Sequence, residues 1–214
     1  MSEEIANPSA CRCGASHRAE ACAHGEQPPS RERRALLKGA LAASLTTALA
    51  DPAPAPAADP KGQRPQVGDL FVFFGGSKPG QVISPSDLPA GAPPVLAWPM
   101  EAATKTVRDG SRLNMVLLVR LDEASLDDAT RGRAAEGIVA FSASCTHALC
   151  PVTGWKAERQ LFWCPCHNSE FDSRNGAKVV FGPAPRPLPA LPIKIADGSL
   201  TAAGTFLGKV GHTS

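Results

Sequence analysis

Two short segments of this chain bring together cysteine and histidine, the side chains that most often bind transition metals in proteins. The first segment is Cys145-x-His147, and the second, Cys164-x-x-His167, follows after 16 intervening residues (148–163). Two thiolates and two imidazoles suit tetrahedral zinc, and they also suit a 2Fe–2S cluster with cysteines on one iron and histidines on the other. The spacing therefore predicts a metal centre that is built from two loops.

Each segment is accompanied by one further cysteine, Cys150 in the first and Cys166 in the second. A zinc site leaves both without a role. An iron–sulfur site can use them as a disulfide that clamps the two ligand loops together, and such a bridge persists only where thiols are oxidised. A structural zinc site remains an alternative, which iron and sulfide analysis would separate from the cluster.

The first fifty residues resemble a twin-arginine export signal. Arg33 and Arg34 are followed by Leu36-Leu37-Lys38 and by an uncharged run at residues 39–50, which ends in Ala-Leu-Ala. This route carries folded, cofactor-loaded proteins across the bacterial inner membrane. The run is shorter than the roughly 20 residues of a membrane-spanning helix, which favours cleavage over retention as an anchor. We expect a periplasmic protein, soluble or attached to the inner membrane, and an Ala-rich surface helix is the alternative reading of this segment.

A second group of metal-binding side chains precedes this signal. Its members are Cys11, Cys13, His17, Cys22 and His24. Their spacing matches no closed structural zinc site well, so we interpret the segment as a leader that is absent once the signal has been cleaved.

The remainder of the chain is typical of an all-β domain. The sequence contains 21 Pro and 19 Gly, against 8 Phe, 3 Trp and no Tyr, which favours short strands and many turns over helices. Residues 51–66 form a Pro/Ala-rich linker, and we expect residues 67–214 to fold as one antiparallel domain. A net charge of +2 offers no basic surface for nucleic acid.

The expected strands are short apolar runs separated by turn residues. They lie at residues 70–74, 94–98, 113–121, 138–142, 160–163, 178–181, 192–195 and 199–202. Asn175-Gly176 and Asp197-Gly198 predict two-residue hairpin turns, because each pair tolerates positive φ. Residues 124–135 have the only helical pattern, and the proline-rich residues 77–94 are interpreted as a surface excursion.

Three motifs together resemble one family. CTHALC at residues 145–150, CPCHNS at 164–169 and Gly182-Pro183-Ala184-Pro185 resemble the two cluster-binding loops and the proline loop of Rieske 2Fe–2S proteins. More narrowly, they are similar to the high-potential, disulfide-containing branch of cytochrome bc-type complexes and arsenite oxidase small subunits. The resemblance implies an antiparallel β-sandwich with a small cluster-binding part at about residues 142–186.

The resemblance also implies the role of each motif residue. Cys145 and Cys164 would bind the buried iron, His147 and His167 the exposed iron, and Cys150 would be joined to Cys166. The implied function is one-electron transfer, as the iron–sulfur subunit of a respiratory oxidoreductase with no substrate chemistry of its own. A Rieske oxygenase is disfavoured, because His212 is the only other histidine of the mature region and no second iron site can be assembled.

The partner is predicted less directly than the cluster. An arsenite-oxidase-like role, with a molybdopterin oxidoreductase as the larger subunit, is the first expectation. The alternative is the Rieske subunit of a quinol:cytochrome c oxidoreductase, with cytochrome b as the larger subunit. In both, a c-type cytochrome is a suitable electron acceptor, and the chain contacts the membrane only if the signal is retained.

Residues beside the ligands are expected to set the reduction potential. Ser169 stands where high-potential members have a hydroxyl that bonds to a cluster sulfide, which stabilises the reduced state. Phe171 replaces a tyrosine that is usual in quinol-oxidising members, so that further bond cannot form. Leu149 and Asn168 replace two usual glycines, and Ala148 replaces a bulky apolar residue. Because leucine disfavours the left-handed conformation, we expect the backbone at Leu149 either to be strained or not to be left-handed.

Overall fold

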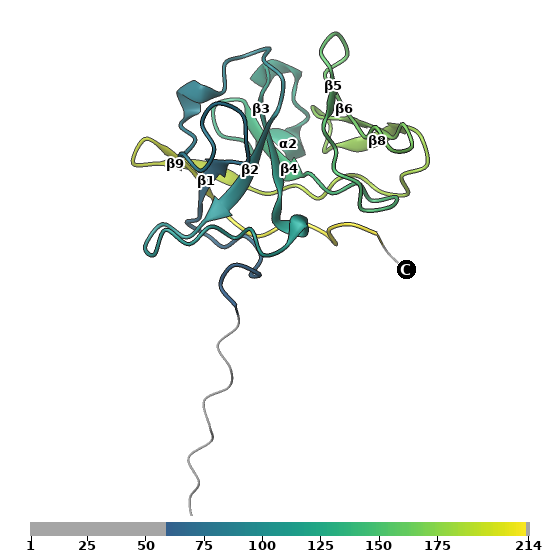
Figure 1. The fold of residues 1–214 in the computed structure, drawn as a ribbon. Coiled ribbons are helices and arrows are strands. Elements are labelled where there is room, and N and C mark those ends of the chain that lie inside the picture. Colours follow the sequence, from purple (N-terminus) through teal and green to yellow (C-terminus); the bar gives the residue numbers. More distant parts are fainter. Residues whose placement is uncertain (1–58, 213–214) are drawn as a thin grey trace, which may run out of the picture. The chain divides into compact units, whose positions relative to one another are not determined.

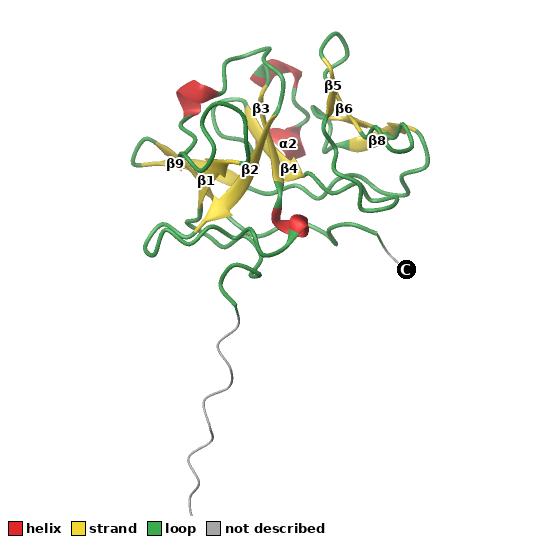
Figure 2. Cartoon of the chain, viewed as in Figure 1, coloured by secondary structure: helices red, strands yellow, loops and turns green. Residues whose placement is uncertain are grey.

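The computed structural model describes residues 59–212, which are almost entirely strands, loops and single helical turns (Figures 1 and 2). Six strands form one sheet: β1 (Leu70–Phe73), β2 (Val95–Met100), β3 (Val116–Arg120), β4 (Ile138–Ser142), β9 (Ile193–Ala196) and β10 (Ser199–Ala202). Four form a second sheet: β5 (Gly154–Lys156), β6 (Leu161–Trp163), β7 (Glu170–Asp172) and β8 (Lys178–Phe181). The helical turns are η1 (Pro85–Asp87), η2 (Arg112–Asn114), η3 (Glu123–Ser125) and α2 (Asp128–Arg131).

The larger sheet is antiparallel, in the order β4-β3-β2-β1-β10-β9, and it curls on itself. Residues just before β9 bond to the opposite edge strand: Ser142 N–H donates to the Pro189 carbonyl, and Leu191 N–H donates to that of Ala140. The chain therefore returns to β4 before it forms β9. This curl encloses a core of side chains from all six strands, which includes Phe71, Leu118 and Leu200.

The strands β3 and β4 are buried on both faces, which explains their nearly continuous apolar sequences. Val116 and Leu118 point into the core of the six-stranded sheet. Leu117 and Val119 point the other way, into a second core that the four-stranded sheet shares. These two strands therefore hold the small sheet against the large one.

The small sheet is the inserted segment between β4 and β9, and Figure 1 shows its strands β5, β6 and β8 to one side of the larger sheet. Its three-residue strands bury few side chains completely. Glu170 of β7 is buried and forms ion pairs with Lys156 and Arg159 of the β5–β6 hairpin. The two segments that carry the predicted ligands are the β4–β5 and β6–β7 connections.

Most predicted strands are confirmed, and β4, β8 and β10 have the expected bounds. The helix predicted at residues 124–135 is wrong beyond the single turn of α2. Asp122 and Asp127 accept bonds from Ala124 N–H and Thr130 N–H and so begin two separate turns, and Gly132 follows the last of them. The three-residue strands β5 and β7 were not predicted.

The turn chemistry was predicted with mixed success. Asp197 and Gly198, at φ 50° and 73°, form the expected two-residue hairpin between paired Ala196 and Ser199. The β7–β8 turn is longer than predicted, since Asp172 pairs with Lys178. Positive φ occurs at Gly176 and Ala177, and Gly176 N–H donates to the Thr130 hydroxyl, so this turn is shaped by a tertiary contact.

The excursion at residues 77–94 is more than a surface loop. Ile83 and Leu88 are buried in the core of the larger sheet. Arg120 donates to the carbonyls of Leu88 and Pro85 and fastens the segment to β3. The prediction was wrong because the many prolines of this segment indicated a surface loop, although Ile83 and Leu88 are core residues.

Across residues 59–212, no helix is long and apolar enough to cross a membrane. The predicted export signal, the N-terminal cysteines and histidines, and most of the linker lie outside the described residues.

Candidate metal centre

The two ligand loops have the same backbone construction. In the first, Cys145 N–H donates to the Cys150 carbonyl, and Leu149 N–H donates to that of Cys145. In the second, Cys164 N–H donates to the Ser169 carbonyl, and Asn168 N–H donates to that of Cys164. Leu149 and Asn168, at φ 62° and 60°, hold equivalent left-handed positions. Each loop thus folds back on its first cysteine and presents its histidine toward the outer side.

Leu149 settles a question that the sequence left open. Its backbone is left-handed, so this non-glycine residue pays the steric cost of that conformation. Asn168 adopts it more readily, and its side-chain oxygen accepts a bond from Trp163 Nε1 at 3.2 Å. The two loops therefore have the same backbone shape, but the conformational strain is greater at Leu149 than at Asn168.

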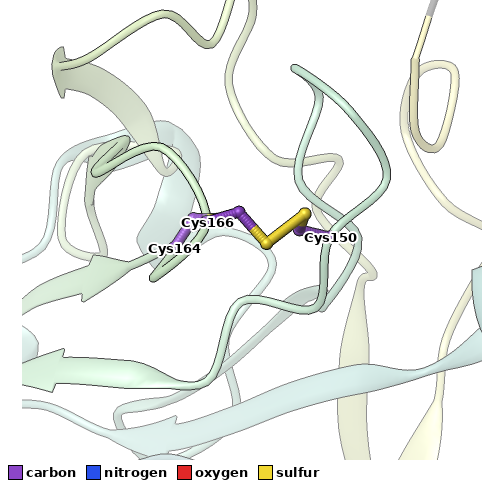
Figure 3. Close-up of side chains that lie close together, drawn as sticks. All are labelled: Cys150, Cys164 and Cys166. Atoms are coloured by element: carbon purple, nitrogen blue, oxygen red, sulfur yellow. A yellow bond between two sulfur atoms is a disulfide. The ribbon is translucent and has the colours of Figure 1, made fainter.

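A disulfide between Cys150 and Cys166 joins the two loops, as the family resemblance implied (Figure 3). The sulfur atoms of Cys150, Cys164 and Cys166 lie within 4.8 Å of one another. Because two of these sulfurs form the disulfide, only Cys164 of the three offers a thiolate to a metal. The other free thiol of the described chain is that of Cys145.

Cys145 and Cys164 are both buried, and both belong to the same core cluster. Burial raises the pKa of the Cys164 thiol, and the nearby Cys145 raises it further. The backbone N–H groups of Cys166 and His167 donate to the Cys164 sulfur and act in the opposite direction, since they stabilise a thiolate. Such a thiol keeps its proton until a metal displaces it.

His147 and His167 meet at the outer side of the two loops. Their Nδ1 atoms are 3.3 Å apart, and the rings are nearly perpendicular. Two nitrogens on one tetrahedral metal, with bonds of about 2.0–2.1 Å as for zinc, would also be about 3.3 Å apart. His147 is half-buried and His167 is exposed.

A third segment, the predicted proline loop at Gly182 to Pro185, closes over the second ligand loop. A Cβ atom at Gly182 would lie 2.6 Å from Ser169 Cα and 2.8 Å from the Asn168 carbonyl, so only glycine allows this approach. Ala184 N–H donates to the Ser169 hydroxyl at 3.1 Å. Within residues 59–212 that hydroxyl has no protein acceptor for its own proton, although Ser169 is completely buried.

The proline loop is also tied to the first ligand loop. The hydroxyl of Thr146, which is completely buried between Cys145 and His147, donates to the Arg186 carbonyl at 2.6 Å. Together with the disulfide and the Ala184–Ser169 bond, this contact connects the three loops in a closed ring. No sequence pattern indicated Thr146, because a lone threonine beside a ligand has no diagnostic spacing.

The residues present fit a 2Fe–2S cluster. Two buried thiols lie together on the inner side, and two imidazoles with facing Nδ1 atoms lie on the outer side. The free hydroxyl proton of buried Ser169 suits a sulfide acceptor. A zinc site would use the same four side chains but would leave this donor unexplained.

Comparisons with known proteins agree with this geometry. Residues 97–192 match the model of the Rieske [2Fe-2S] domain. The cytochrome bc1 complex Rieske iron-sulfur subunit of Streptomyces lividans is 35% identical over 148 residues, which cover 67% of this chain and 85% of that protein. The subunit of the same name from Streptomyces coelicolor is 32% identical over 190 residues.

The coverage of these relatives is uneven. The alignment with the Streptomyces coelicolor subunit covers 84% of this chain but only 53% of that protein, so the chain spans about half its length. Among solved structures, the cyanobacterial plasma membrane Rieske protein PetC3 from Synechocystis PCC 6803 is 31% identical. That match covers 41% of this chain and 75% of PetC3, with a TM-score of 0.31.

Proposed function

Because the chain belongs to the Rieske [2Fe-2S] family and carries electrons through its cluster, we propose that it is the iron–sulfur subunit of a quinol-oxidising complex. Its larger partner would be a cytochrome b-type subunit, and its electron acceptor a c-type cytochrome. The names of both Streptomyces relatives support this role over the arsenite-oxidase-like one predicted first from the sequence.

We propose the following ligand assignment. Cys145 and Cys164 hold the inner iron of the cluster, and His147 and His167 hold the outer one. The cluster supplies a one-electron acceptor whose potential is raised by the two neutral imidazoles. The chain's own residues bury the cysteine side and leave the histidine side at the surface, which gives an electron a short path to a docked partner.

The observation that carries the proposed partner is the lack of charged residues within the three loops themselves. Residues 142–155, 160–169 and 179–185, which contain the three loops, include no Asp, Glu, Lys or Arg. Leu149, Val180 and Phe181 are exposed there, by 44%, 48% and 60%. A surface of this kind loses little solvation when it docks, whereas each buried charge would cost several kcal/mol. It suits a partner surface that is itself apolar, as at the edge of a membrane protein.

The disulfide supports the proposed compartment. We propose export by the twin-arginine route to the oxidising side of the inner membrane. Cys166 is exposed, so its bond to Cys150 would meet cytosolic reductants if the protein remained inside the cell.

Purification of the tagged full-length chain from its native membranes tests the proposed partner. A co-purifying subunit should show the redox difference spectrum of b-type haem, and added quinol should reduce the cluster in that preparation. A preparation that contains molybdenum and no b-type haem would contradict the proposal and restore the arsenite-oxidase-like alternative. A Leu149→Glu variant places a charge among the exposed apolar residues of the loops. Quinol-dependent reduction that persists in this variant would contradict docking through these residues.

A further inference from the structure

The side chain of Arg186 forms hydrogen bonds to the backbone near the C-terminal end of the described chain. Its Nη1 donates to the Lys209 carbonyl at 3.0 Å, and its Nη2 donates to the Gly211 carbonyl at 2.6 Å. The fork of the guanidinium thus holds the C-terminal tail (residues 208–212) at two points. Its Nε is buried without an acceptor among residues 59–212, so the side chain keeps this position despite an unsatisfied donor. The guanidinium group of Arg186 is therefore bound to the tail and is not a free surface charge.

The backbone of the same residue reaches the first ligand loop. The Arg186 carbonyl accepts the bond from Thr146, which stands between the proposed ligands Cys145 and His147. A displacement of Arg186 by the tail would therefore move an acceptor that the first loop uses. The connection from tail to loop passes through one residue.

A second contact joins the tail to the same loop by packing. A Cβ atom on Gly211 would collide with the Leu149 side chain, and Gly211 has φ 79°. The tail therefore packs directly against the Leu149 side chain, and a residue larger than glycine would require that side chain to move. Leu149 is the residue that holds an unfavourable left-handed backbone, so the contact confines the loop at its strained position.

The second ligand loop has other supports. Asn168 is bonded to Trp163, and Ser169 lies against Gly182 of the proline loop. Within the described chain, the hydrogen bonds of residues 164–169 include none to residues 208–212. In that same part of the chain, residues 145–150 form no hydrogen bond of their own to the tail either, but the tail reaches them through the Leu149 side chain and through Arg186.

We propose that the C-terminal tail is a strap that positions the first ligand loop, with Arg186, Thr146 and Gly211 as its positioning residues. The strap fixes the left-handed turn at Leu149 and thereby the direction in which His147 is presented. This inference rests on the proposed ligand assignment but not on the proposed quinol partner. Tests on the isolated, cluster-loaded full-length protein therefore distinguish its failure from a wrong partner.

Hydrogen exchange followed by mass spectrometry compares the two loops within one molecule. In Arg186→Gln, amides of residues 145–150 should exchange about tenfold faster, the size expected when bonds to a charged group are lost, while residues 164–169 keep their rate. Arg174→Gln is the matched control, because it removes the same charge from an ion pair with Asp172. Unchanged exchange in both loops, or an equal rise in both, would overturn the strap.

The EPR spectrum of the reduced cluster provides a readout that general destabilisation does not move. Thr146→Val should change the g-values or broaden the signal, whereas Thr146→Ser keeps the hydroxyl and should retain the original spectrum. Gly211→Ala, which disturbs the packing of the tail on Leu149 and strains the backbone at φ 79°, should resemble Thr146→Val even if Arg186→Gln fails to fold. Identical spectra for Thr146→Val, Gly211→Ala and the unaltered protein would overturn the proposal.

Discussion

The two faces of β3 and β4 border cores of different kinds. On one face, Val116 and Leu118 join a core of apolar side chains from all six strands of the larger sheet. On the other, Leu117 and Val119 join a core that includes Cys145 and Cys164 and that is closed by three-residue strands. The first core is an ordinary hydrophobic interior, whereas the second surrounds the proposed metal ligands.

The two cores therefore contribute differently to the stability of the larger and the small sheet. The larger sheet is stabilised mainly by the burial of apolar side chains from its six strands. The small sheet adds cross-links to its limited burial: a disulfide, the ion pairs of Glu170, the contacts between loops and the cluster itself. We therefore expect global stability and the properties of the metal centre to respond to different substitutions.

Adjacent leucines of β3 provide the largest test of this comparison. Leu118→Ala and Leu117→Ala each remove a buried side chain and should lower the free energy of unfolding by about 2–5 kcal/mol. Only Leu117→Ala opens the core that contains the cysteines, so only this variant should lose its cluster faster. Denaturant unfolding and the decay of the cluster's visible absorbance measure the two effects. Equal rates of cluster loss in both variants would show that the two cores are not independent.

Removal of the disulfide should weaken the small sheet alone. Cys150→Ser with Cys166→Ser frees two loops joined across a sequence separation of 16, which should cost about 3 kcal/mol of local stability. Amides of β5 to β8 should exchange faster, and the cluster should be lost sooner, while β1 and β10 keep their protection. Faster exchange throughout both sheets would contradict a local role for the bridge.

The sequence predicted the metal centre better than it predicted the supports of that centre. Cysteine and histidine at fixed spacing identify the ligand loops, and the family motifs assign the disulfide that the structure contains. Apolar runs bounded by turn residues were sufficient for strands that face a core, such as β4 and β10. In these places local chemistry and tertiary structure favour the same outcome.

The missed features depend on contacts between distant residues. The strands β5 and β7 are too short for an alternating pattern to be recognised. Gly211 and Arg186 gain their roles only because the chain returns to the ligand loops after β10. Leu149 has a left-handed backbone, although leucine disfavours this conformation. Its side chain packs against the tail, a contact that the sequence does not reveal.

A substitution beside the cluster should change the potential and not the fold. Ser169→Ala removes a hydroxyl that is free to donate to a sulfide, so the reduced state loses a bond to a charged group. Such bonds contribute about 1.5–3 kcal/mol, which corresponds to a fall of roughly 65–130 mV for one electron. Ser173→Ala is the control, because it removes a buried hydroxyl that bonds to the Gln160 carbonyl instead. Protein-film voltammetry measures both, and equal potentials in the two variants would contradict a bond from Ser169 to the cluster.

The smallest expected effect comes from restoring a hydroxyl at Phe171. This side chain is completely buried in the core that contains Cys145 and Cys164, so a tyrosine there must direct its hydroxyl to a partner within that core. A neutral bond of about 0.5–1.5 kcal/mol to a cysteine ligand would raise the potential by roughly 20–65 mV. Phe162→Tyr, at the paired position on β6, adds the same group to the same core and controls for the effect of a buried hydroxyl alone; we expect it to leave the potential unchanged. A Phe171→Tyr potential equal to or below that of the unaltered protein would show that Phe171 does not limit it.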